Sequence, residues 1–228
     1  MRRKTEDCKM TEREAQARSY MEKLLLGPGC KNPDRARMRY RVEHSLRAAS
    51  VGREVAKAEA LNEEALAVAL LLHDVAYAEL MPGDDWREHG RMGARMVRPF
   101  VESLGFAKQD EADILAGIAL HVDMRADFPC EKTVMARSVC DCDNIDRFDV
   151  FRQPLVLQEA RFDELTTDER IAFCDERLKQ TAQARSFPLA TATARALWGN
   201  RLDFQKEYFR RLRAQLERER EWTVNAAC

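Results

Sequence analysis

The sequence lacks the features of membrane, exported and nucleic-acid-binding proteins. No stretch of its 228 residues approaches the roughly 18 consecutive apolar residues of a membrane span. The first twenty residues contain four acids and no apolar core, so we expect no export or organelle-targeting signal. A formal net charge of -1 gives no overall field to attract a polyanion. We therefore expect neither a membrane nor a nucleic acid polymer as a partner.

An ordered set of cysteines is also missing. The seven cysteines are an odd number without regular spacing. Small secreted proteins use even, regularly spaced sets to build disulfide frameworks, and zinc fingers use closely spaced thiolate pairs. The cysteines therefore favour a reducing, cytoplasmic location over a disulfide scaffold or a thiolate zinc site.

Glycine, proline and alternating strand patterns are scarce. Only 9 glycines and 7 prolines interrupt the chain, and apolar residues mostly recur every three or four positions. This pattern predicts an all-α protein, and the length suits one compact single-domain bundle over residues 1–228. The predicted helical segments are 11–26, 34–60, 62–72, 86–104, 110–121, 131–151, 167–184 and a long last helix ending near 221.

Two of these segments have distinctive apolar faces. Residues 65–72 are apolar on nearly every side, which places that helix in the centre of the protein. The last helix has one apolar stripe and charged residues elsewhere, so the stripe suits packing inside the protein or against a second copy in a homodimer. The stripe consists of Trp198, Leu202, Phe209, Leu212 and Leu216.

The histidines are few and clustered. All four lie between His44 and His121, and the pair His73-Asp74 interrupts the most apolar helix at its C-terminal end. A buried charge is costly there unless it is paired or bound to metal. By itself His73 is better explained as a hydrogen-bonded core residue. With His44 on the preceding helix, the group suits Mn, Fe, Co, Ni or Zn, and Mg less well.

A further carboxylate is available in the acid-rich run 141–146. We predict Asp143 as the residue that joins the histidines. Asp141 lies on a different helix face and Asp146 lies one turn further along, so both remain alternatives.

The order His44, His73-Asp74, Asp143 resembles the HD-domain superfamily of metal-dependent phosphohydrolases, which is named for its adjacent His-Asp pair. The resemblance implies an HD-type helical core at about 39–150, flanked by helices at 10–26 and about 165–221. It also implies that these four residues bind a divalent metal ion.

The other two histidines extend the resemblance to the two-metal branch of this superfamily. His89 is followed by Gly90, and His121 ends the next helix. In that branch one ion would be held by the four residues above, and a second by His89, His121 and a shared Asp74. The alternative for each is an ordinary helix-terminal histidine.

The resemblance implies hydrolysis of a small phosphorylated substrate, with nucleotides as the first class to consider. His73 and Asp74 would take part in catalysis through the metal. Arg47, one turn after His44, would bind the phosphate, with Arg91, Arg125 and Arg147 as weaker candidates. Acids next to the histidines would orient an imidazole or transfer a proton, unless they are surface residues; these acids are Glu88 and Asp123.

Two other functions remain open. Some relatives use the same six ligands in a di-iron oxygenase that acts on a small polyol or phosphonate. A non-catalytic nucleotide-binding module would retain the metals for structure alone. Oxygen consumption would identify the oxygenase, and tight nucleotide binding without turnover would identify the module.

Overall fold

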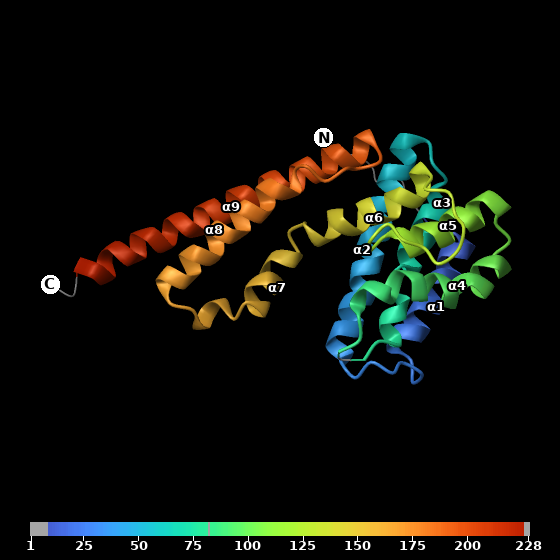
Figure 1. Cartoon of the computed structure of the whole chain (residues 1–228), viewed down its shortest axis with the longest axis horizontal. Helices are drawn as coiled ribbons and strands as arrows, with labels where there is room; N and C mark the ends of the chain where they lie inside the picture. The colour runs from blue at the N-terminus through green and yellow to red at the C-terminus, as the bar shows by residue number, and fades with distance from the viewer. Residues whose placement is uncertain (1–8, 82, 226–228) are drawn as a thin grey trace. The chain divides into compact units, whose positions relative to one another are not determined.

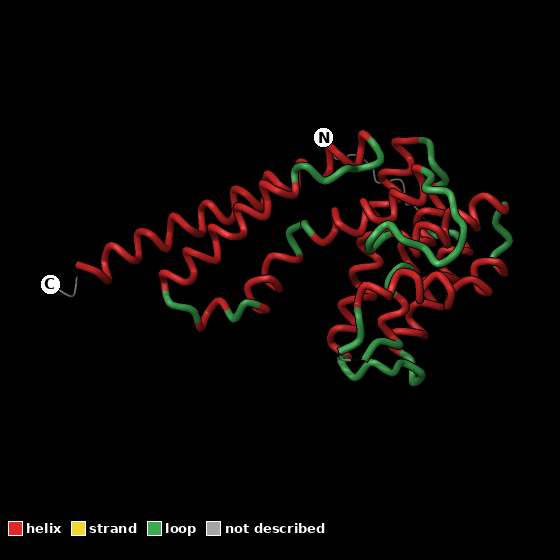
Figure 2. The backbone as a smooth tube through the Cα atoms, in the orientation of Figure 1, coloured by secondary structure: helices red, strands yellow, loops and turns green. Residues whose placement is uncertain are grey.

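The computed structural model describes residues 9–81 and 83–225. All regular elements in these residues are helical, and none is a strand (Figure 2). The predicted all-α class is confirmed. The α-helices are α1 (Glu12–Leu26), α2 (Arg35–Glu59), α3 (Glu63–Leu72), α4 (His89–Ser103), α5 (Lys108–Leu120), α6 (Val134–Arg147), α7 (Arg152–Glu159), α8 (Thr167–Ala184) and α9 (Ala192–Asn225). Three short 3-10 helices are η1 (Val75–Ala78), η2 (Trp86–Glu88) and η3 (Phe162–Glu164).

Several helices begin at the side chains that the sequence suggests. Asn62 accepts a hydrogen bond from the Ala65 amide and caps α3. Thr11 and Glu14 form a capping box at the start of α1. These caps satisfy amide groups that have no partner inside the helix.

Helix α3 is the central element of the first part of the chain. Every residue from Ala65 to Leu72 is buried, as the apolar sequence predicts. It packs against α1, α2 and α5. This packing brings the end of α3, where His73 and Asp74 lie, into the interior.

The described backbone divides into two compact units, one ending at Asp143 and the other beginning at Asn144. The expectation of one domain therefore stays a prediction. The first unit contains α1 to α5 and most of α6. The second contains α7 to α9, of which α8 and α9 run side by side (Figure 1).

The apolar stripe of α9 is used within the second unit. Phe209 and Leu216 pack with Ile171 and Cys174 of α8. Trp198 is buried, and its ring lies 4.5 Å from that of Phe148, centroid to centroid. The stripe therefore gives no support to a homodimer, which stays a prediction.

Two segments differ from the prediction. The predicted helix 131–151 ends at Arg147, and α7 begins separately at Arg152. The predicted helix from 86 is a 3-10 turn followed by α4, whose first residue is His89.

None of the described helices is both long and apolar enough to cross a membrane.

Candidate metal centre

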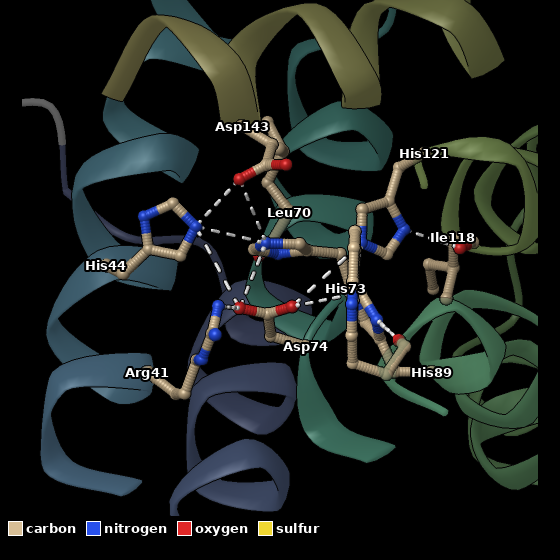
Figure 3. Close-up of polar contacts among 10 residues, drawn as sticks. Arg41, His44, Leu70, His73, Asp74, His89, Ile118, His121 and Asp143 are labelled. Carbon is tan, nitrogen blue, oxygen red and sulfur yellow. Dashed lines mark hydrogen bonds and ion pairs between the residues drawn. The ribbon is translucent and has the colours of Figure 1, made fainter. Parts of the chain in front are cut away.

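The six predicted ligand residues come together in the first unit (Figure 3). Each is at most 5% exposed. They are His44 within α2, His73 and Asp74 at the end of α3, His89 at the start of α4, His121 at the end of α5, and Asp143 on α6.

One group forms around His44 and His73. The Nε2 atoms of these two residues are 3.3 Å apart. Asp143 Oδ1 lies 2.9 Å from His44 Nε2 and 3.8 Å from His73 Nε2. Asp74 Oδ2 lies 3.5 Å from His73 Nε2 and 3.9 Å from His44 Nε2. Asp143 of the acidic run therefore reaches both histidines.

A second group forms on the other side of Asp74. Its Oδ1 atom lies 3.2 Å from His89 Nε2 and 3.9 Å from His121 Nε2. The two imidazole Nε2 atoms are 2.9 Å apart. Asp74 therefore presents one carboxylate oxygen to each pair of histidines.

Main-chain carbonyls fix the orientation of three imidazoles. A carbonyl oxygen only accepts hydrogen bonds, so each Nδ1 carries the proton and Nε2 presents a lone pair inward. The carbonyls of Leu70 and Ile118 are available because they lie in the last turns of α3 and α5, where carbonyls have no partner within the helix. The Trp86 carbonyl also accepts from the His89 amide. The contacts are His73 Nδ1 to Leu70 O at 2.7 Å, His121 Nδ1 to Ile118 O at 2.7 Å, and His89 Nδ1 to Trp86 O at 2.5 Å.

This arrangement fits a bound cation. The Nε2 atoms of His89 and His121 face each other 2.9 Å apart. Burial, with the nearby His89 and His73, lowers the pKa of His121 to about 3, which favours a neutral imidazole that can coordinate a cation. Imidazole nitrogen and carboxylate oxygen suit Zn, Mn, Fe, Co or Ni.

Two sets of ligand atoms lie close enough to share an ion. In each set the atoms are within 4.8 Å of one another. The sets are His44, His73 and Asp143, and His73, Asp74 and His121. The number of ions, one or two, stays a prediction.

Comparison with known proteins identifies the family. The model of the HD domain matches residues 41–149, a span that includes all six residues. This chain contains an HD domain. The expected membership of the HD-domain superfamily is confirmed, whereas its two-metal branch stays a prediction.

A solved structure has a similar fold. It is the crystal structure of a predicted HD superfamily hydrolase from an uncultured Thermotogales bacterium. The match has a TM-score of 0.58 and 19% sequence identity, and covers 86% of this chain and 91% of that one. No curated protein matches the chain.

The aspartate of the HD pair is held as an anion. Burial alone would raise the pKa of Asp74, but the charge of Arg41, with the neighbouring His73 and His89, keeps it well below its ordinary value. Arg41 Nη1 donates to Asp74 Oδ2 at 2.8 Å. The face of the buried Tyr77 ring supports this guanidinium at 3.8 Å from the ring centroid.

Sequence reasoning missed Arg41 and chose Arg47. The two residues lie three positions before and after His44, so both share its helix face. In the structure Arg41 contacts the HD pair, while the guanidinium of Arg47 lies 6.0 Å from the Tyr40 ring centroid. The spacing from His44 makes Arg41 as good a candidate as Arg47 but does not choose between them, and the catalytic role of Arg47 stays a prediction.

The acids beside the outer histidines pair with an arginine. Glu88 and Asp123 both pair with the Arg91 guanidinium, at 3.1 Å and 3.0 Å. Neither acid orients the imidazole of His89 or His121 through its Nδ1 atom, because main-chain carbonyls accept the hydrogen bonds of both Nδ1 atoms. Arg91, one of the candidate phosphate-binding residues, is therefore paired with both acids. Arg125 is exposed, and Arg147 belongs to the second unit.

Proposed function

We propose that this HD-domain protein is a metal-dependent hydrolase that cleaves a phosphate ester or anhydride bond of a small molecule, with nucleotides as the preferred class. The observation that carries the proposal is the position of Asp74. Its two carboxylate oxygens face two different pairs of histidines. The hydrolase description of the Thermotogales protein agrees with this proposal.

Metal binding would involve the six residues as two groups. His44, His73, Asp143 and Asp74 Oδ2 would hold one divalent ion, and His89, His121 and Asp74 Oδ1 would hold another. Ions at these positions would supply Lewis acidity and a more acidic water at neutral pH. We expect Fe, Mn, Co, Ni or Zn rather than Mg, because the set contains four imidazoles.

Arg41 supports an anionic substrate. One of its nitrogens binds Asp74, and its Nε atom is buried with no hydrogen-bond partner in the described structure. A buried donor without a partner is costly, and a guanidinium matches the geometry of phosphoryl oxygens. We therefore assign Arg41 the role of contacting a phosphoryl oxygen, while its other arm keeps Asp74 in place.

The decisive experiment combines metal analysis with assays of anaerobically purified protein. We expect Asp74→Ala to lose bound metal and phosphate release together, because its carboxylate belongs to both groups. His89→Gln should lose only the second equivalent of metal. Asp123→Ala is the matched control: it removes an acid next to the second group that pairs with Arg91, and should keep both metals.

Three outcomes would overturn the proposal. Retained activity in Asp74→Ala would exclude this centre as the reactive site. Turnover that needs oxygen would favour the di-iron oxygenase. Tight nucleotide binding without phosphate release from any phosphoester would favour the binding module.

A further inference from the structure

Trp86 is an exposed aromatic residue at the edge of the candidate metal centre. Its side chain is 50% exposed, although tryptophan is among the most apolar side chains. Trp86 is the first residue of η2, the 3-10 turn that ends directly before His89. An aromatic ring exposed beside a polar site can contact an apolar or aromatic part of a ligand.

The main chain connects Trp86 directly to the metal centre. Its carbonyl oxygen accepts the Nδ1 proton of His89, so the residue that orients this imidazole also carries the exposed ring. The ring centroids of Trp86 and His89 are 6.3 Å apart, with their planes tilted by 32°. A ligand with its phosphate at the histidines would therefore reach Trp86 across a short spacer such as one sugar.

Local hydrogen bonds hold the segment that carries Trp86. Asp84 accepts from the Met81 amide at 2.8 Å. Asp85 accepts from the Arg87 amide at 3.0 Å and caps the 3-10 turn. The Arg87 guanidinium lies 5.7 Å from the Trp86 ring centroid. The turn that carries the ring is thus capped at its start by Asp85.

From these observations we infer that Trp86 is a stacking platform for the base of a nucleotide substrate, and that this residue produces the preference for nucleotides over sugar phosphates. The inference rests on the proposed function and deepens it. Every nucleobase has a π face, so the platform should accept purines and pyrimidines with little discrimination.

Binding measurements on the metal-loaded full chain test this platform without relying on turnover. The probes are adenosine 5′-monophosphate, which has a planar base, and ribose 5-phosphate, which lacks one. We expect calorimetry to give about tenfold tighter binding of the nucleotide, the size of one base–aromatic stack. Trp86→Ala should remove that difference and leave ribose 5-phosphate binding unchanged, while Trp86→Phe should largely keep it.

Trp222 provides the matched control. It is 81% exposed on α9 and belongs to the second unit, whereas all six predicted ligands belong to the first, so Trp222→Ala removes the same side chain from the unit that holds no predicted ligand. In Trp222→Ala the ratio of nucleotide affinity to ribose 5-phosphate affinity should equal the ratio in the unmodified chain. The inference would be overturned if Trp86→Ala kept that same ratio, or if the unmodified chain did not prefer the nucleotide. A preserved nucleotide preference without phosphate release would overturn the proposed function alone.

Discussion

At the scale of single residues, Gly90 controls the distance between two predicted metal ligands. A Cβ atom at this position would lie 2.9 Å from the carbonyl oxygens of Ile118 and Ala119, so α5 leaves no room for it. We expect Gly90→Ala to push α4 from α5, separate His89 from His121 and cost about 1–3 kcal/mol of stability. Thermal unfolding and metal stoichiometry would measure both effects.

Gly93, one turn along the same helix, is the matched control. A Cβ there would find its nearest neighbours at 3.4 Å and 3.5 Å, which is ordinary contact. Because alanine favours a helix over glycine by about 1 kcal/mol, Gly93→Ala should be neutral or slightly stabilising. Equal losses of metal in both variants would show that Gly90 has no special role in the spacing of the histidines.

Residue types and spacing predicted which side chains gather, but not how each is held. His73-Asp74 at the end of an apolar helix indicates a buried polar site from sequence alone. The carbonyls that orient the imidazoles belong to residues such as Leu70 and Ile118, whose side chains carry no such information. Likewise, helical spacing puts Arg41 and Arg47 on one face, and only tertiary packing brings Arg41 to Asp74.

At the scale of elements, the pair α8 and α9 depends on Phe209. This side chain is fully buried and packs beside Phe173 of α8, with ring centroids 6.2 Å apart. We expect Phe209→Ala to destabilise the pair by about 3–5 kcal/mol. Phe204→Ala, on the same helix but 38% exposed, should cost less than about 1 kcal/mol. Chemical denaturation followed by circular dichroism would compare the two.

The same pair of variants tests whether this helical pair affects the metal centre. All six predicted ligands lie in the unit that ends at Asp143, so bound metal should remain in Phe209→Ala. Loss of metal in this variant but not in Phe204→Ala would show that the pair supports the centre.

Helix positions were predictable where a cap or a breaker marks them. Asn62 and Thr11 begin helices as expected, and segment 167–184 coincides with α8. The predicted segment 131–151 extended past the end of α6, because residues 148–151 contain neither glycine nor proline, and α7 lay outside every predicted segment. The 3-10 turn before His89 was missed because its periodicity continues that of α4.

At the scale of the molecule, no feature of the sequence marks the boundary between the two units. Length and composition suit one domain, and the boundary falls within α6, where no linker composition marks it. The HD match, residues 41–149, also extends across this point. How strongly the two units cooperate is therefore a matter for experiment rather than for sequence patterns.

Metal removal would test this cooperation. The predicted ligands come from α2 to α6, so bound ions would tie five helices together, and chelation would leave the facing imidazoles of His89 and His121 without a cation. Ligand at 100 times its dissociation constant stabilises the folded state by about 2.7 kcal/mol. We expect chelation to accelerate hydrogen exchange in α2 to α5 and to leave α8 and α9 unchanged. Equal acceleration in both units would show that they unfold together as one domain, and unchanged exchange throughout would contradict a structural contribution of metal.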